Sequence, residues 1–142
     1  MNSVIIDASI AIQAILPCAG HERAYKLIED FVERDVIICV PHLWYSEVTT
    51  GIRKSAVIGG ISYENAMLAL YSILNLPVEK ADEDSELYIQ AYRWAERLGQ
   101  LAVYDSVYIA LAERRNAEFY TADRRLFNRC QQIGVQFVKL KE

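Results

Sequence analysis

Residues 4–17, VIIDASIAIQAILP, place a strand, an acid and a helix in direct succession. The β-branched run at residues 4–6 is typical of a buried strand. Helical sequence follows over residues 9–16 and is ended by Pro17, because proline disrupts the interior of a helix. Asp7 lies at the junction, so its carboxylate is expected at the carboxyl end of the first strand.

The same alternation of short strands and helices continues along the chain. Further strands are predicted at residues 36–40, 76–79, 118–121 and 135–139. Further helices are predicted at residues 21–34, from Pro41 to residue 55 or 58, at 63–74, at 83–98, from near Asp105, and at 124–130. This pattern favours an α/β fold with a mostly parallel central sheet of about five strands flanked by helices. Pro77 marks its strand as an edge strand.

The length and the hydrophobic content fit one globular unit. The chain has 142 residues, of which 53% are hydrophobic, and it contains no internal repeat or linker. Residues 1–142 are therefore expected to form a single domain. No apolar run is long enough to span a membrane, and the first residues are expected to be a strand and a helix rather than a signal peptide. Three cysteines without paired spacing fit a reducing cytoplasm.

The charge of the chain limits the classes of partner. A net charge of −4 argues against nucleic-acid binding through overall charge. Basic side chains nevertheless cluster at Arg53, at Arg114 and at Arg124, Arg125 and Arg129. Each cluster is also explained as a solvated helix end.

Three aspartates occupy positions where α/β proteins place their sites. Asp7 follows the first strand directly, and Asp123 follows the strand at 118–121 by two residues. Asp105 opens a helix that is apolar around most of its circumference. Ligands of parallel sheets bind beside the carboxyl ends of the strands. Each aspartate taken alone is also explained as a helix N-cap.

Glu47 lies beside the apolar face of its predicted helix. In PHLWYSEVTTGIRK (residues 41–54), apolar side chains recur four residues apart at Trp44, Val48 and Ile52. Glu47 borders that stripe, and no Lys or Arg lies within one turn on the same face. A carboxylate near a core is strongly unfavourable unless something compensates its charge. Glu47 therefore either bends outward to water or belongs to a site.

The four acids together predict a metal site. If they converge, their mutual repulsion demands cations, and carboxylate oxygens suit Mg²⁺ or Mn²⁺. Such ions activate water and stabilise the charge that develops at phosphorus when a phosphodiester is cleaved. The chain offers no credible Cys or His nucleophile set, which also favours activated water.

Four stretches carry a resemblance to a known family. They are VIIDASIAIQAIL (4–16), VPHLWYSEVTTGIRK (40–54), LAVYDSVYIALAERRNAEFYTADRRLF (101–127) and VQFVKL (135–140). In this order and at these spacings they resemble the PIN-domain ribonucleases, in particular the small prokaryotic VapC toxins of toxin–antitoxin modules. The resemblance spans essentially the whole chain and implies a metal-dependent endoribonuclease.

The resemblance also implies roles for individual residues. The four family acids, which bind one or two Mg²⁺ or Mn²⁺ ions and are catalytic, fall on Asp7, Glu47, Asp105 and Asp123. The polar accessories of the family motifs fall on Ser9 and Thr121, although a plain capping or turn role explains both equally well. The RNA backbone is expected to contact arginines near the site, at Arg124, Arg125 and Arg53.

The family further implies partners. VapC-like proteins commonly form homodimers and are inhibited by a cognate antitoxin whose C-terminal segment approaches the acidic site. Most apolar side chains of residues 41–74 are expected to serve the core or a dimer contact, and some to line the antitoxin groove; the candidates are Trp44, Tyr45, Ile58, Tyr63, Met67 and Tyr71.

Three rival interpretations remain. A haloacid-dehalogenase-type phosphatase needs a second aspartate two residues after the first, where this chain has Ser9. A receiver domain needs a phospho-accepting aspartate after its third strand, and LPVEKADED (76–84) fits this poorly because its acids are typical of a solvated helix start. The third is a non-catalytic PIN-like binding or scaffold module, which the complete set of four acids argues against.

Overall fold

Five parallel strands form the centre of the protein. The computed structural model describes residues 2–141. All strand pairs are parallel, and the strand order is β3-β2-β1-β4-β5. The strands are β1 (Ser3–Ile6), β2 (Ile37–Val40), β3 (Val78–Lys80), β4 (Glu118–Thr121) and β5 (Val138–Leu140). The predicted α/β fold with five parallel strands is confirmed.

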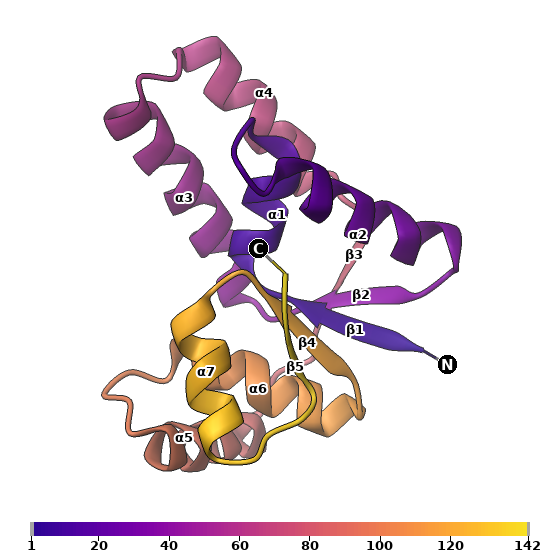
Figure 1. Cartoon of the computed structure of the whole chain (residues 1–142), viewed down its shortest axis with the longest axis vertical. Coiled ribbons are helices and arrows are strands. Elements are labelled where there is room, and N and C mark those ends of the chain that lie inside the picture. The colour runs from indigo at the N-terminus through magenta and orange to yellow at the C-terminus, as the bar shows by residue number, and fades with distance from the viewer. Residues whose placement is uncertain (1, 142) are drawn as a thin grey trace.

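The described residues form seven helices around the sheet. They are α1 (Ala8–Ile15), α2 (His21–Glu33), α3 (Leu43–Gly59), α4 (Tyr63–Leu74), α5 (Ser85–Leu98), α6 (Tyr104–Arg115) and α7 (Arg124–Gln132). In Figure 1, α1 and α2 lie on one side of the sheet and α5, α6 and α7 on the other. The helices α3 and α4 pack together and project beyond the sheet as an arm (Figure 1). None of the helices in residues 2–141 has the length and hydropathy of a membrane span.

Two predicted strands differ from the observed ones. β3 begins at Val78 instead of residue 76, because Pro77 has no amide hydrogen and the Val78 amide donates back to the Leu76 carbonyl at 2.7 Å. β5 begins at Val138 instead of residue 135, because the backbone before it is hydrogen-bonded to the C-terminal end of α7. The Val135 amide donates to the Cys130 carbonyl. The prediction that Pro77 marks an edge strand is confirmed.

Helix α6 packs directly against the central strands of the sheet. Every residue from Ser106 to Ala112 is buried, as the apolar sequence predicts for a helix enclosed on all sides. The helix packs against β1 and β4 and against α5. Its start therefore lies at a fixed place beside the two central strands.

A glycine lets α3 approach α1 closely. A Cβ atom added at Gly51 would lie 2.2 Å from Cδ1 of Ile12, which is closer than carbon atoms can approach. Asp7 caps α1 and Glu47 lies one turn before Gly51 in α3. The close crossing of these helices therefore sets how near the two acids lie.

We predict that Gly51→Ala destabilises the protein, although alanine is intrinsically the better helix former by about 1 kcal/mol. Overpacking against Ile12 costs about 1–3 kcal/mol, so the expected net loss is about 1 kcal/mol, measured by urea denaturation. Ile12→Val removes the clashing atom, and the double variant should recover most of the loss. A Gly59→Ala control has nothing within 4 Å of its Cβ. Equal stability of the two glycine variants would contradict the close crossing.

Candidate active site

The central strands bring two of the predicted acids to one edge of the sheet. β1 pairs with β4 so that Ile6 lies opposite Tyr120. Asp7 follows β1 directly, Thr121 is the last residue of β4, and Asp123 comes two residues later. Because the strands are parallel, their carboxyl ends meet at the same edge, as the sequence predicts.

Asp7 is held by two hydroxyl groups. Ser9 donates to one carboxylate oxygen and Thr121 donates to the other. Each hydroxyl also accepts a backbone amide from the turn after β4: Ser9 from Ala122 at 3.2 Å and Thr121 from Asp123 at 3.0 Å. The predicted accessory residues therefore tie Asp7 to the neighbouring strand. Asp7 is also the N-cap of α1, so the capping and site interpretations hold together.

Glu47 points into the protein and not outward to water. It is partly buried, and one carboxylate oxygen accepts a 2.6 Å hydrogen bond from the hydroxyl of Tyr108. Tyr108 lies on α6, is almost fully buried, and stacks on Phe119 of β4 with ring centroids 5.4 Å apart. This contact joins α3 to the buried helix and compensates part of the cost of burying a carboxylate.

Asp105 does not cap α6. The N-cap position is Val103, which offers no side-chain acceptor, and Asp105 lies in the first turn. The N-cap interpretation of Asp105 was wrong because the helix begins at Tyr104. The carboxylate of Asp105 instead accepts a hydrogen bond from the side-chain amide of Gln100 at 3.2 Å. Asp123, in contrast, is the N-cap of α7, as expected of an aspartate there.

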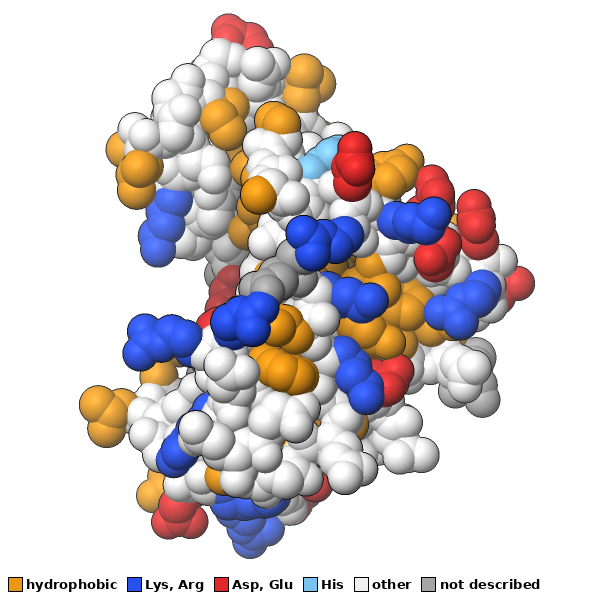
Figure 2. All heavy atoms as spheres, in the orientation of Figure 1, with side chains coloured by type: hydrophobic (Ala, Val, Ile, Leu, Met, Phe, Trp, Pro, Cys, Tyr) orange, Lys and Arg blue, Asp and Glu red, His pale blue; other side chains and the backbone are white. Residues whose placement is uncertain are grey.

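A hollow of about 380 Å³ opens in front of Asp105 and Asp123. Its lining comes from the α5–α6 loop and the starts of α6 and α7: Gln100, Asp105, Asp123, Arg125, Leu126 and Arg129. Figure 2 shows acidic side chains at the bottom of an indentation between the two halves of the molecule, with basic side chains on both rims. Asp105 is half-buried in the hollow and Asp123 is exposed at its edge, with Arg125 and Arg129 in the same lining.

The four acids interact electrostatically. Burial raises the pKa of Asp7 to about 6, against the hydrogen bonds from Ser9 and Thr121, and Asp105 contributes to the rise. Burial also raises the pKa of Glu47; the Tyr108 hydroxyl opposes this, and the charges of Asp7 and Asp105 add to it. The pKa of Asp105 is raised first by burial and then by Asp123, against the Gln100 hydrogen bond. Their charges therefore repel one another across one site.

The donor chemistry fits a hard cation. All four side chains offer carboxylate oxygens, which Mg²⁺ and Mn²⁺ prefer. Within residues 2–141, no three His, Cys, Asp or Glu side chains stand close enough together to form a ready-made cage. An open arrangement of this kind suits Mg²⁺, which keeps several waters and takes one or two carboxylates directly. Both histidines face backbone carbonyls elsewhere: His21 that of Gln13 and His42 that of Ala81.

Comparison with known proteins agrees with this geometry. The PIN domain family profile matches residues 4–131. The chain belongs to the PIN-domain family. It is 32% identical to the VapC ribonuclease Mb0985 of Mycobacterium bovis over 123 residues, which is 87% of each chain. It is 28% identical to ribonuclease VapC1 of Mycobacterium tuberculosis over 126 residues, 89% of this chain and 90% of that one.

A solved structure shows the same fold. The crystal structure of VapBC2 from Rickettsia felis, bound to a DNA fragment from its promoter, superposes with a TM-score of 0.69. The match covers 99% of both chains at 17% identity. The predicted resemblance to VapC proteins is confirmed. The phosphatase and receiver-domain interpretations are therefore wrong.

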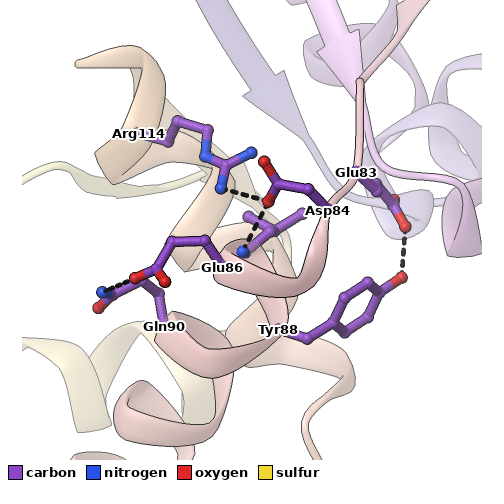
Figure 3. Close-up of polar contacts among 7 residues, drawn as sticks. Glu83, Asp84, Glu86, Tyr88, Gln90 and Arg114 are labelled. Carbon is purple, nitrogen blue, oxygen red and sulfur yellow. Dashed lines mark hydrogen bonds and ion pairs between the residues drawn. The ribbon is translucent and has the colours of Figure 1, made fainter.

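The acidic run at residues 76–84 builds a helix start, as its sequence predicts. Asp84 accepts a hydrogen bond from the Arg114 guanidinium at 2.7 Å (Figure 3) and another from the Leu87 backbone amide at 2.9 Å, which makes Asp84 the N-cap of α5. Glu83 accepts from the hydroxyl of Tyr88 and from the backbone amide of His42. These acids are committed to structure outside the hollow.

The arginines that the sequence analysis singled out differ in their surroundings. Arg125 lines the hollow, and within residues 2–141 its guanidinium has no hydrogen-bond or ion-pair partner. Arg129 lines the same hollow but donates to the carbonyl of Leu98 at 2.9 Å, so it is bound to the C-terminal end of α5. Arg53 lies elsewhere, in a groove of about 450 Å³ between α3 and α4 with Tyr63 and Met67.

Two residues of the site were missed from the sequence, namely Tyr108 and Gln100. Tyr108 carried a usable signal, because the hydroxyl of a tyrosine in a fully buried helix needs a hydrogen-bond partner. Gln100 carried none: its contact with Asp105 depends on the path of the loop after Gly99. Of the apolar groove candidates, Trp44 is fully buried in the core, whereas Ile58, Tyr63 and Tyr71 are exposed.

We predict that metal-free protein loses stability as the pH rises through about 6. The folded state binds the Asp7 proton more tightly than the unfolded chain, so the stabilisation is complete below about pH 4 and is lost above the raised pKa. Between pH 5 and pH 7.5 this amounts to at most about 1.4 kcal/mol. Urea denaturation in EDTA of the wild type and of Asp7→Asn measures it. From pH 5 to pH 7.5, the free energy of unfolding of Asp7→Asn should rise relative to that of the wild type. A difference between the two proteins that stays constant with pH would contradict the account.

Proposed function

We propose that this PIN domain is a metal-dependent endoribonuclease and the toxin of a toxin–antitoxin pair. The observation that supports the proposal is that acids from four separate segments act on one another's charge in pairs: Asp105 on Asp7, both of these on Glu47, and Asp123 on Asp105. The names of its relatives, which are VapC ribonucleases, support the same activity. A binding or scaffold module would have no need for three partly buried carboxylates that repel one another, with a fourth at the edge of the same hollow.

The acids have the chemistry to hold one or two Mg²⁺ or Mn²⁺ ions, directly or through water. When bound, such an ion lowers the pKa of water and stabilises negative charge on a phosphate. Asp7 is the most firmly placed of the four, since Ser9 and Thr121 fix both of its oxygens. Tyr108 fixes Glu47 and Gln100 fixes Asp105. Rigid placement of this kind is what a metal site requires.

The rims of the hollow supply the binding groups for RNA. Arg125 stands beside Asp105 and Asp123 and is suited to a bidentate contact with a phosphate. Arg124 is the neighbouring residue at the start of α7, and we assign it to the RNA backbone as well. Arg53 belongs to the α3–α4 arm, so any contact with RNA there is more distant from the acids. Positive rims around acidic ligands attract the backbone while leaving the acids to the ions.

An antitoxin and a second copy of the chain are the proposed protein partners. The VapBC2 structure of Rickettsia felis supports the first by its name. The groove between α3 and α4 is apolar with Arg53 at its edge, which suits an apolar peptide that carries an acid. All three cysteines are free thiols, which supports a reducing cytoplasm as the place of action.

We predict that the purified protein cleaves a labelled single-stranded RNA in Mg²⁺ or Mn²⁺ and not in EDTA. Asp7→Asn and Asp105→Asn should each lower the cleavage rate by about 100-fold or more, since each removes a charge that the ions need. Asp82→Asn, the same change at an exposed acid outside the hollow, should leave the rate unchanged. Cleavage that survives EDTA, or that falls equally in Asp82→Asn, would contradict the proposal. Binding of RNA without any cleavage would favour the scaffold module.

A further inference from the structure

One exposed aromatic residue adjoins an acid of the site in the chain. Tyr104 is the first residue of α6 and directly precedes Asp105. Its residue surface is 64% exposed, whereas the residues from Ser106 to Ala112 in the same helix are buried. Within residues 2–141, Tyr104 makes no side-chain hydrogen bond and no ring contact. An exposed ring at this place is unexplained by the packing of the fold.

The other exposed tyrosines do not share this position. Tyr88 donates its hydroxyl to Glu83, and Tyr92 lies on the same helix one turn later. Tyr25 belongs to α2, and Tyr63 and Tyr71 belong to α4. Tyr104 alone among them adjoins a carboxylate of the hollow in the chain, so its Cα lies about 3.8 Å from that of Asp105.

Hydrogen bonds fasten the segment before Tyr104 to α5 and to Asp105. Gly99 ends α5 in a left-handed conformation. The backbone amide of Gln100 donates to the Ala95 carbonyl at 2.9 Å and completes the C-terminal cap of α5. Arg129 of α7 donates to the Leu98 carbonyl, and the Gln100 side chain donates to Asp105. The loop is thus fastened at both sides of the hollow.

We propose that Tyr104 is a stacking platform for a nucleobase of single-stranded RNA, next to the phosphate that faces the acids. The proposal rests on the ribonuclease function. A phosphate over Asp105 and Asp123 carries its sugar and base within reach of the adjoining ring. Aromatic rings bind bases of every sequence through their faces, and single-stranded RNA offers unstacked bases. Leu101, fully exposed in the same loop, extends the apolar surface.

Charge favours RNA over a protein at this place. The hollow that contains Asp105, the residue after Tyr104, combines acids, which need cations, with a guanidinium at Arg125 that has no partner within residues 2–141. An anionic backbone satisfies Arg125 and shares the cations of the acids, and its bases require an apolar face. A loop fixed before binding loses little entropy when it receives the base.

The test measures RNA affinity in a protein that cannot cleave. All variants carry Asp7→Asn, and binding of a fluorescein-labelled single-stranded RNA in Mg²⁺ is followed by anisotropy. Tyr104→Ala should raise Kd about tenfold, within a range of about 5- to 100-fold for the loss of one base–aromatic stack. Tyr104→Phe and Tyr104→Trp keep a ring and should bind as the parent does, or more tightly. Tyr92→Ala, which removes an exposed ring from α5, is the matched control and should change nothing.

A second ligand separates stacking from charge and folding. An abasic RNA of the same length has the phosphates but no bases, and Tyr104→Ala should bind it as well as the parent does. Equal affinities of Tyr104→Ala and the parent for normal RNA would overturn the proposal, as would an equal loss on abasic RNA. A changed oligomeric state with unchanged RNA affinity would assign Tyr104 to a protein interface and overturn it too. Failure of the parent itself to bind RNA would overturn the ribonuclease proposal along with this one.

Discussion

The carboxylate of Asp7 lies between two hydroxyl groups that also hold the turn after β4. Ser9 and Thr121 donate to its two oxygens and accept the amides of Ala122 and Asp123. The ends of β1 and β4, the start of α1 and the cap of α7 are thereby joined around one negative charge. The positions of the other acids follow from elements that pack on this junction, since α3 crosses α1 at Gly51 and α6 packs on both strands.

The charges at this junction lower the stability of the metal-free protein, and they are suited to binding a cation. Burial and mutual repulsion raise the pKa values of Asp7, Glu47 and Asp105, so their ionised forms destabilise the folded chain. Proteins commonly give up stability at sites of function in this way. Each of these acids has a dedicated donor, which keeps it in place without removing its charge. A divalent cation would offset the repulsion that remains.

The sequence predicted the sheet well and the contacts of the site less well. Alternating strands and helices gave the parallel sheet, and acids placed after strands gave the correct edge, because both depend on local order along the chain. The start of β3 was missed by two residues because Val78 bonds locally beside Pro77. The Tyr108–Glu47 bond joins residues 61 positions apart. The Gln100–Asp105 bond depends on the path of the loop after Gly99. Neither contact has a periodic signal in the sequence.

Titration calorimetry with Mn²⁺ at pH 7.5 tests the central claim most directly, because it needs neither an RNA substrate nor an antitoxin. The account predicts that the wild-type protein and the Asp82→Asn control bind one or two ions per chain. Asp7→Asn should lose at least one of them or bind it about tenfold or more weakly, since one carboxylate is gone from a repelling set. Identical binding isotherms for the wild type and Asp7→Asn, or no heat from either protein, would contradict the claim that the junction at Asp7 is built to receive a cation.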